Sequence, residues 1–168
     1  MKAIKLGLLF LFTIAVNSTT NAQDASQLTL DRIYSSEFRG ESARSISWIH
    51  DGDAFVTIEQ TEDGQDQLIK YESKSNAQEI FLSAEALTPS GEDQALQIAD
   101  FSLSNDESKV LIFTNTSRVW RSNTKGDYWV YDLDTKALKQ LGAALPSSSL
   151  MFAKFSDSNE HVAYVSGF

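Results

Sequence analysis

Arg121 is the residue of this chain whose type and surroundings best suit chemistry. It lies in the stretch SRVWRSNTKGDYWVYDL, Ser117 to Leu133, beside Trp120 and not far from Trp129. A guanidinium group offers five N–H donors in a fixed fork and stays charged at any relevant pH, so it can hold a carbonyl or carboxylate oxygen. The structural alternative is an ion pair with Asp127 or stacking on a tryptophan. The residues alone leave both roles open.

No other arrangement of residues predicts catalysis. The nucleophile elbow Gly-x-Ser-x-Gly is missing from the sequence. There are no cysteines, so thiol catalysis and cysteine-based metal sites are excluded. His50 and His161 are isolated from each other, and the acidic stretches 51–55 and 156–160 suit hairpin turns. We therefore predict no catalytic residue, no metal site and no cofactor in this chain.

An internal repeat organises the rest of the sequence. The segments SISWIHDGDAFVTIEQ (45–60), IADFSLSNDESKVLIFTN (98–115) and LMFAKFSDSNEHVAYVSG (150–167) share one pattern. Each reads as a strand that ends in an aromatic residue, a polar turn and a second strand of alternating apolar residues. Trp48, Phe101 and Phe155 recur at intervals of 53 and 54 residues. Such a constant register predicts a repeated structural unit.

Each full unit contains two further strands. These are 66–73 and 78–84 in the first unit, and 127–133 and 137–142 in the second. Enrichment in Val, Ile, Phe, Tyr and Trp favours strands, and the one candidate helical stripe is Leu28 to Tyr34. Four antiparallel strands at a period of roughly 50 residues are typical of β-propeller blades. The predicted fold class is all-β, an incomplete β-propeller with two full four-stranded antiparallel blades and the start of a third.

The predicted domain organisation follows from this repeat. It comprises a signal peptide (1–22), a lead-in segment (23–44), blade 1 (45–84), an interblade linker (85–97), blade 2 (98–142) and the truncated start of blade 3 (150–168). Propellers close with about four to eight blades. We therefore expect the chain to be the amino-terminal piece of a longer protein.

The connection that carries Arg121 is expected to be unusually long. In blade 1 the second and third strands are joined by the short link 61–65, whereas in blade 2 the same link would run from about Asn115 to Gly126. An insertion at one end of a rigid scaffold is a common way to build a binding site. The interblade linker 85–97 is expected at the same end of the blades as Arg121.

Charge and the first residues indicate an exported protein. The chain has 14 Lys and Arg against 23 Asp and Glu, a formal net charge of −9, which argues against a nucleic-acid partner. Lys2 and Lys5 precede the apolar run 6–16, and Thr20-Asn21-Ala22 suits a signal peptidase, with cleavage after Ala22. We expect a periplasmic or extracellular location without a stable membrane span after cleavage.

Four stretches of the sequence carry a family resemblance, and they are LTLDRIYSSEF, SWIHDG, LIFTNTSRVWRSNTKGDYWVYDL and LMFAKFSDSNEHVAYV. They resemble the amino-terminal half of dipeptidyl peptidase IV type proteins of the prolyl oligopeptidase clan, in their bacterial exported form. The resemblance implies an eight-bladed propeller that caps an α/β-hydrolase domain with a Ser-Asp-His triad. It implies release of dipeptides with Pro or Ala in the second position, and contact of Arg121 with a substrate carbonyl.

By the same resemblance, the partners are a peptide substrate and the protein's own carboxy-terminal α/β-hydrolase domain, which is absent here. The glutamate pair that binds the substrate ammonium lies downstream, and a homodimer of the full-length form stays open. Two alternatives also stay open: a stand-alone exported propeller that binds proteins or peptides without catalysis, and the propeller of a prolyl tripeptidyl peptidase. The reading frame beyond Phe168 distinguishes an enzyme from a binding protein.

Overall fold

The computed structural model describes residues 27–40 and 44–167, which belong to two separate units. The predicted signal peptide, 1–22, lies outside the described residues. In the first unit a single short helix, α1 (Leu30–Tyr34), begins at Thr29, whose hydroxyl accepts the Arg32 N–H at 3.3 Å. The predicted helical stripe is thus a five-residue helix. No helix within the described ranges is long and apolar enough to cross a membrane.

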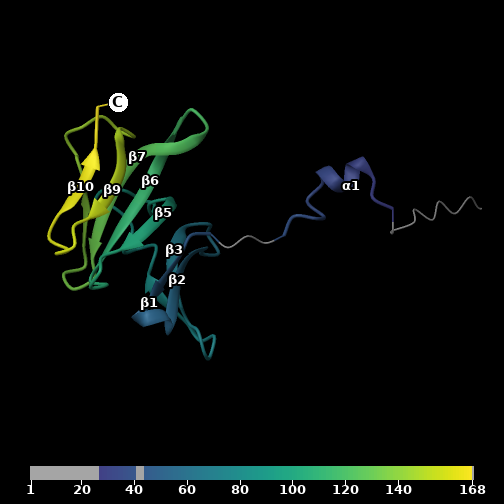
Figure 1. The fold of residues 1–168 in the computed structure, drawn as a ribbon, viewed down its shortest axis with the longest axis horizontal. Coiled ribbons are helices and arrows are strands. Elements are labelled where there is room, and N and C mark those ends of the chain that lie inside the picture. Colours follow the sequence, from purple (N-terminus) through teal and green to yellow (C-terminus); the bar gives the residue numbers. More distant parts are fainter. Residues whose placement is uncertain (1–26, 41–43, 168) are drawn as a thin grey trace, which may run out of the picture. The chain divides into compact units, whose positions relative to one another are not determined.

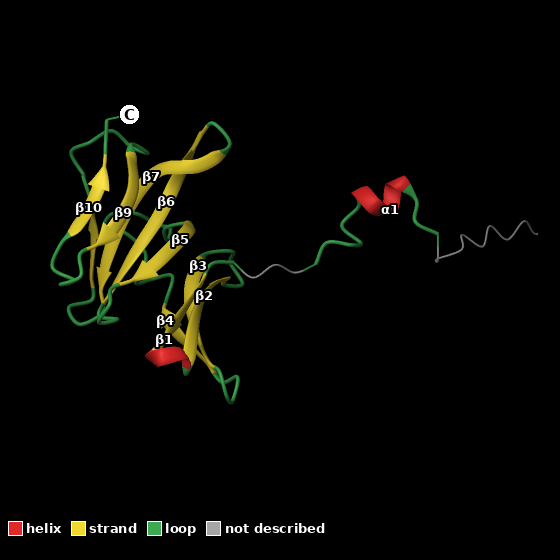
Figure 2. Cartoon of the chain, viewed as in Figure 1, coloured by secondary structure: helices red, strands yellow, loops and turns green. Residues whose placement is uncertain are grey.

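The second unit begins with a four-stranded antiparallel sheet (Figures 1 and 2). Its strands follow one another in chain order, β1 (Ile46–Ile49), β2 (Ala54–Gln60), β3 (Asp66–Glu72) and β4 (Gln78–Leu82). A short 3-10 turn, η1 (His50–Gly52), joins the first two strands. Buried and partly exposed residues alternate along β2, as expected of a strand with one face on the core.

A second antiparallel sheet follows, with strands β5 (Ile98–Leu103), β6 (Lys109–Val119), β7 (Ser122–Asp132), β8 (Ala137–Gln140), β9 (Leu150–Phe155) and β10 (Val162–Val165). Strands β5 to β8 are neighbours in chain order. The prediction of a mostly β, antiparallel chain is therefore confirmed. Strand β9, in the segment predicted to begin blade 3, pairs with β7 through Lys125 and Gly126. Strand β8 pairs only with residues 129–132 of β7. Residues 125 and 126, on the same edge of β7, therefore stay available to β9.

Two apolar layers hold the sheets together. The larger layer lies between the first sheet and strands β5 to β7, and Leu87 of the interblade linker is completely buried in it. Its buried members are Ile49, Ala54, Val56, Ile58, Leu68, Leu82, Leu87, Ile98, Phe101, Val110, Ile112 and Tyr131. A smaller layer forms on the other face of β6 and β7, where Leu111 and Tyr128 pack with Leu150 of β9. The first sheet thus packs on the second through an apolar layer, as expected for repeated units that stack.

The three repeated turns define how the units correspond. Each is closed by a pair of residues five positions apart: Ile49 with Ala54, Ser104 with Lys109, and Ser156 with His161. The fourth residue of each turn, Gly52, Glu107 or Asn159, has a positive φ. This alignment matches Trp48 with Leu103 and Phe155. The expected match of Trp48 to Phe101 is therefore wrong by two residues. Because side chains alternate between the two faces of a strand, Phe101 and Leu103 lie on the same face, and the face assigned to the repeat is unchanged.

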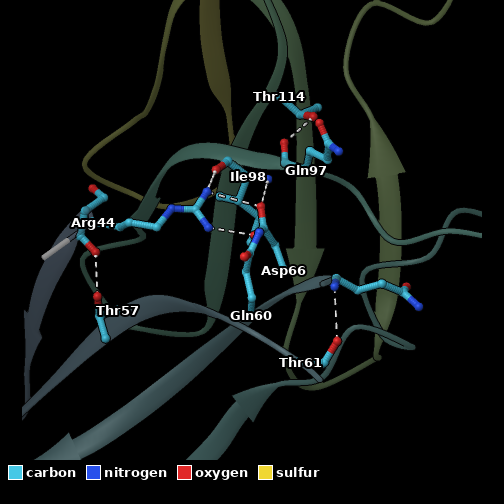
Figure 3. Close-up of polar contacts among 10 residues, drawn as sticks. Arg44, Thr57, Gln60, Thr61, Asp66, Gln97, Ile98 and Thr114 are labelled. Atoms are coloured by element: carbon cyan, nitrogen blue, oxygen red, sulfur yellow. Dashed lines mark hydrogen bonds and ion pairs between the residues drawn. The ribbon is translucent and has the colours of Figure 1, made fainter. Parts of the chain in front are cut away.

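Asp66 joins the two sheets through a polar cluster at their junction, which we call the Asp66 clamp (Figure 3). The residue is only 4% exposed. Its carboxylate accepts Nη1 of Arg44 at 2.6 Å, Nη2 of Arg44 at 3.2 Å and the Ile98 N–H at 2.7 Å. Arg44 Nη2 also donates to the Ile98 carbonyl at 2.5 Å. The backbone at the start of β5 is therefore held on both its donor and its acceptor side.

Two opposing effects set the pKa of Asp66. Burial disfavours the charged form and by itself would raise the pKa. The hydrogen bonds from Arg44 and from the Ile98 N–H outweigh burial, so the pKa lies below its ordinary value of 3.8. Folding therefore favours the ionised carboxylate, and the clamp contributes stability in the charged state.

We predict that Asp66→Asn lowers the free energy of unfolding of the protein that carries this chain by about 1–3 kcal/mol at neutral pH. The amide leaves Arg44 without an anion and offers the Ile98 N–H a weaker acceptor. Urea denaturation monitored by circular dichroism measures the change. Asp63→Asn, in the exposed turn before β3, is the matched control and should leave the free energy unchanged.

The difference between the wild type and Asp66→Asn should also depend on pH. A carboxylate with a lowered folded-state pKa contributes stability above its unfolded pKa, and the contribution is lost as the pH falls through the folded-state pKa. The gap between the two unfolding free energies should thus be full at neutral pH and shrink below pH 3.8. A gap that stays constant across this range would show that the charge of Asp66 is not what stabilises the clamp.

Candidate functional site

Arg121 lies at the tip of the hairpin formed by β6 and β7, which projects beyond the neighbouring strand β5 (Figure 1). The long link expected from about Asn115 to Gly126 is itself paired, because the strands continue out to Val119 and Ser122. Only Trp120 and Arg121 remain as the turn. Thr, Ser, Val and Asn side chains along this stretch suit a strand that is exposed on both faces, a pattern without the apolar alternation that marks a core strand.

The tip itself is a strained two-residue turn. Trp120 has a φ of 59° and is 94% exposed. Glycine is the usual residue at such a position, and a bulky side chain there costs about 1–2 kcal/mol. Strain of this kind is concentrated at functional sites in proteins. The Arg118 Nε donates to the Trp120 carbonyl at 3.1 Å and helps to hold the turn.

Neither structural role considered for Arg121 is found. Its side chain is exposed and makes no hydrogen bond, ion pair or ring contact with any residue in the ranges 27–40 and 44–167. Asp127 bonds other groups, and Trp129 packs against the larger apolar layer. Among the described residues, the N–H donors of this guanidinium group are therefore unused.

The base of the hairpin is held by a polar cluster, defined here as the hairpin joint and formed by Asn115, Asp127, Ser147 and Ser148. Asn115 Nδ2 donates to Asp127 Oδ2 at 2.7 Å and to Ser147 Oγ at 2.8 Å. The Ser148 N–H donates to Asp127 Oδ1 at 2.7 Å, and the Ser148 hydroxyl donates to the Asn115 carbonyl at 2.6 Å. Asn115 has a left-handed φ of 46°.

Close packing below the joint leaves no room for a side chain at Gly126. A Cβ added there would lie 2.4 Å from the Phe113 ring and 2.6 Å from the Thr114 carbonyl oxygen. The Phe113 ring stacks on Tyr128 at 4.7 Å between centroids. Thr114 is buried, and its hydroxyl donates to the Gln97 carbonyl at 2.6 Å, next to the Asp66 clamp. The hairpin therefore stands on a rigid base.

An open groove of about 560 Å³ runs beside the hairpin joint. The interblade linker supplies one wall from Pro89 to Gln97, and Asn115, Asp127 and Trp129 lie on the other. The linker is thus adjacent to the base of the hairpin that carries Arg121. Glu92 and Asp127 are the charged residues in this lining. Within the described ranges, no group of three or more His, Asp or Glu side chains could hold a metal ion.

Sequence reasoning missed most of the hairpin joint. It considered Asp127 only as a partner of Arg121 and assigned no structural role to Asn115, Ser147 or Ser148. Asn115 and Asp127 are 12 positions apart, and the two serines lie 20 and 21 positions beyond Asp127. Serines in a loop carry no periodic signal. One local signal was available, since Asn is among the few non-glycine residues that adopt a left-handed conformation readily.

The hairpin formed by β6 and β7 lies within a segment that matches a protein-family model. Residues 104–167 match the model described as "Dipeptidyl peptidase IV (DPP IV) N-terminal region". This segment contains the turns at Glu107 and Asn159, the whole of β6 and β7, and Arg121.

Curated relatives share the similarity over most of the chain. It is 27% identical over 146 residues to a probable dipeptidyl-aminopeptidase B of Phaeosphaeria nodorum, covering 82% of this chain and 16% of the relative. It is 29% identical over 151 residues to the protein of the same description from Podospora anserina, covering 83% and 16%. The chain thus spans less than a fifth of the length of these relatives.

The fold also matches a solved structure. The crystal structure of Porphyromonas gingivalis dipeptidyl peptidase 4 aligns with a TM-score of 0.65 and 21% sequence identity, over 82% of this chain and 19% of that one. The resemblance inferred from the sequence is confirmed: residues 104–167 match the model of the dipeptidyl peptidase IV N-terminal region, and most of the chain is distantly similar to dipeptidyl-aminopeptidases.

Proposed function

We propose that this chain is the amino-terminal propeller portion of an exported serine dipeptidyl peptidase that releases Xaa-Pro or Xaa-Ala dipeptides from peptide amino termini. The observation that carries the proposal is the Arg121 side chain, which has no partner in the described ranges and stands on a rigidly based hairpin inside the family-matched segment. The names of the relatives support the peptidase class. Catalysis itself would belong to an α/β-hydrolase domain that this chain does not contain.

The role proposed for Arg121 is to position the substrate. Its forked N–H donors would bond a carbonyl oxygen of the bound peptide and fix the chain relative to the catalytic serine of the other domain. No proton moves at Arg121, because a guanidinium group stays protonated throughout. The contribution to rate would come from orientation, since a misplacement of about 1 Å can cost two orders of magnitude.

Stacking of the sheets supports the propeller architecture. Leu103 packs on the layer shared with the first sheet, and Phe155 packs on the second sheet. The corresponding residue of the first unit, Trp48, is 63% exposed. It forms an aromatic row with Phe55 at 5.5 Å and, through Phe55, with Tyr71 at 5.1 Å. A further sheet of the same kind would cover this row and close a ring.

Export remains the proposal for the location of the protein. The positive residues, the apolar run and the small residues before position 23 support cleavage after Ala22 and a periplasmic or extracellular product. Sequencing of the amino terminus of the purified protein tests this, and a terminus that retains Met1 would contradict it.

The gene should continue beyond Phe168 through further repeats and into a Gly-x-Ser-x-Gly segment that precedes Asp and His. Sequencing of the reading frame checks this expectation. A stop codon after a few further blades would instead support the alternative of a stand-alone propeller that binds peptides or proteins without catalysis. Specificity for tripeptides rather than dipeptides would show in the products released from a peptide with proline at its third position.

In the full-length enzyme, Arg121→Ala should lower kcat/KM for dipeptidyl substrates by an order of magnitude or more, because positioning of the carbonyl is lost. Steady-state kinetics on a chromogenic Xaa-Pro substrate measure the change. Lys139→Ala, which removes an exposed cation from β8, is the control and should retain wild-type kinetics. Near-normal kinetics of Arg121→Ala would remove this residue from the site.

Residues 23–168 in isolation should self-associate, because the aromatic row that contains Trp48 is uncovered. Trp48→Glu should reduce this association in analytical ultracentrifugation. Trp120→Glu is a demanding control, since Trp120 is the more exposed of the two tryptophans but lies at the hairpin tip, outside the row. A monodisperse wild-type monomer, or equal effects of the two variants, would refute the role of this face.

A further inference from the structure

We propose that the hairpin joint sets the direction of the β6–β7 hairpin, and that Asn115 and Asp127 are thereby positioning residues for Arg121. This inference rests on the proposed function of Arg121. It assigns to the chain a device that would orient Arg121 and is made of residues at the base of the hairpin, away from its tip.

The joint lies where the hairpin bends. Pairing is regular up to Thr114 opposite Asp127 and resumes at Ser117 opposite Lys125, so β6 contains an extra residue here. A second shift between Ser117 and Arg118 places the extra residue in β7. Bulges bend a strand and redirect the side chains beyond them. The outer part of the hairpin therefore points where the first bulge directs it.

Side chains of the joint hold that first bulge in one conformation. The left-handed Asn115 is part of the bulge, and its amide bonds both Asp127 across the hairpin and Ser147 from the segment before β9. Ser148 completes the arrangement by donating its N–H to Asp127 and its hydroxyl to the Asn115 carbonyl. The bend is thus tied across both strands and to a third segment of the chain.

The length of the hairpin amplifies any change at this point. Trp120 lies five positions after Asn115, and a strand rises about 3.3 Å per residue, so the tip lies about 16 Å from the joint. A tilt of about 10° at the joint would displace the tip by about 3 Å, more than a carbonyl hydrogen bond tolerates. Arg121 could not correct this displacement through contacts of its own, since it has none among the described residues.

Asn115→Gly in the full-length enzyme tests the proposal. Glycine accepts the left-handed conformation but removes the amide that ties the joint. We expect kcat/KM for a chromogenic Xaa-Pro substrate to fall about 5- to 10-fold, with a melting temperature within a few degrees of the wild type. Asn76→Gly is the matched control, because Asn76 has a similar φ of 55° in the exposed turn between β3 and β4. This control should keep wild-type kinetics.

A double-mutant cycle separates positioning from general destabilisation. If the joint acts through Arg121, adding Asn115→Gly to Arg121→Ala should lower kcat/KM less than twofold further. Asp127→Asn, which keeps the size of the side chain, should repeat this pattern and decides the question if Asn115→Gly does not fold. Full multiplication of the two effects, or normal kinetics of both joint variants, would overturn the inference. Normal kinetics of Arg121→Ala alone would instead overturn the proposed function.

Discussion

The buried carboxylate of Asp66 is the interaction on which the arrangement of the two sheets depends. Apolar layers favour contact between sheets but specify their relative position only loosely, because dispersion and the hydrophobic effect are not directional. The Asp66 clamp adds direction, since Arg44 and the Ile98 backbone both bond the Asp66 carboxylate and so bring three segments of the chain together. It fixes where β5 begins, and the Thr114 hydroxyl on the Gln97 carbonyl carries that position into β6. These hydrogen bonds connect the base of the hairpin that carries Arg121 to the first sheet.

Most of the fold could be predicted from the sequence, because core strands show apolar alternation and turns are rich in polar residues and glycine. Several of these turn residues adopt a positive φ in the structure. Strand β2 is an example, with its alternating buried residues, and Gly52 and Asn159 mark two of the turns. The match of Trp48 to Phe101 was wrong by two residues because both Phe101 and Leu103 face the same layer. Composition alone cannot decide between two apolar residues two positions apart in a strand, whereas the hydrogen bonds that close the turn can.

For the candidate site, the sequence suggested the residue Arg121 and its chemistry but not the hairpin that carries it. Arg121 was identifiable because guanidinium beside tryptophan is an unusual pair in an otherwise polar stretch. The outer halves of β6 and β7 were not identifiable as strands, because a hairpin exposed on both faces lacks the apolar period that core packing imposes. The hairpin joint depends on contacts between positions as distant as Asn115 and Ser148. Such polar contacts are decided by the tertiary fold and leave no local pattern.

The role proposed for Arg121 requires both a well-ordered hairpin base and a guanidinium group without a competing partner. If Arg121 had a partner in its own chain, a substrate carbonyl would have to displace that partner and lose part of its binding energy. If the base were loose, ordering the hairpin on binding would cost conformational entropy instead. Gly126 under the Phe113 ring and the bonds of Asn115 limit the second cost, and the exposed guanidinium group avoids the first. The left-handed φ of Trp120 is consistent with the proposed role, because backbone strain is concentrated at functional sites.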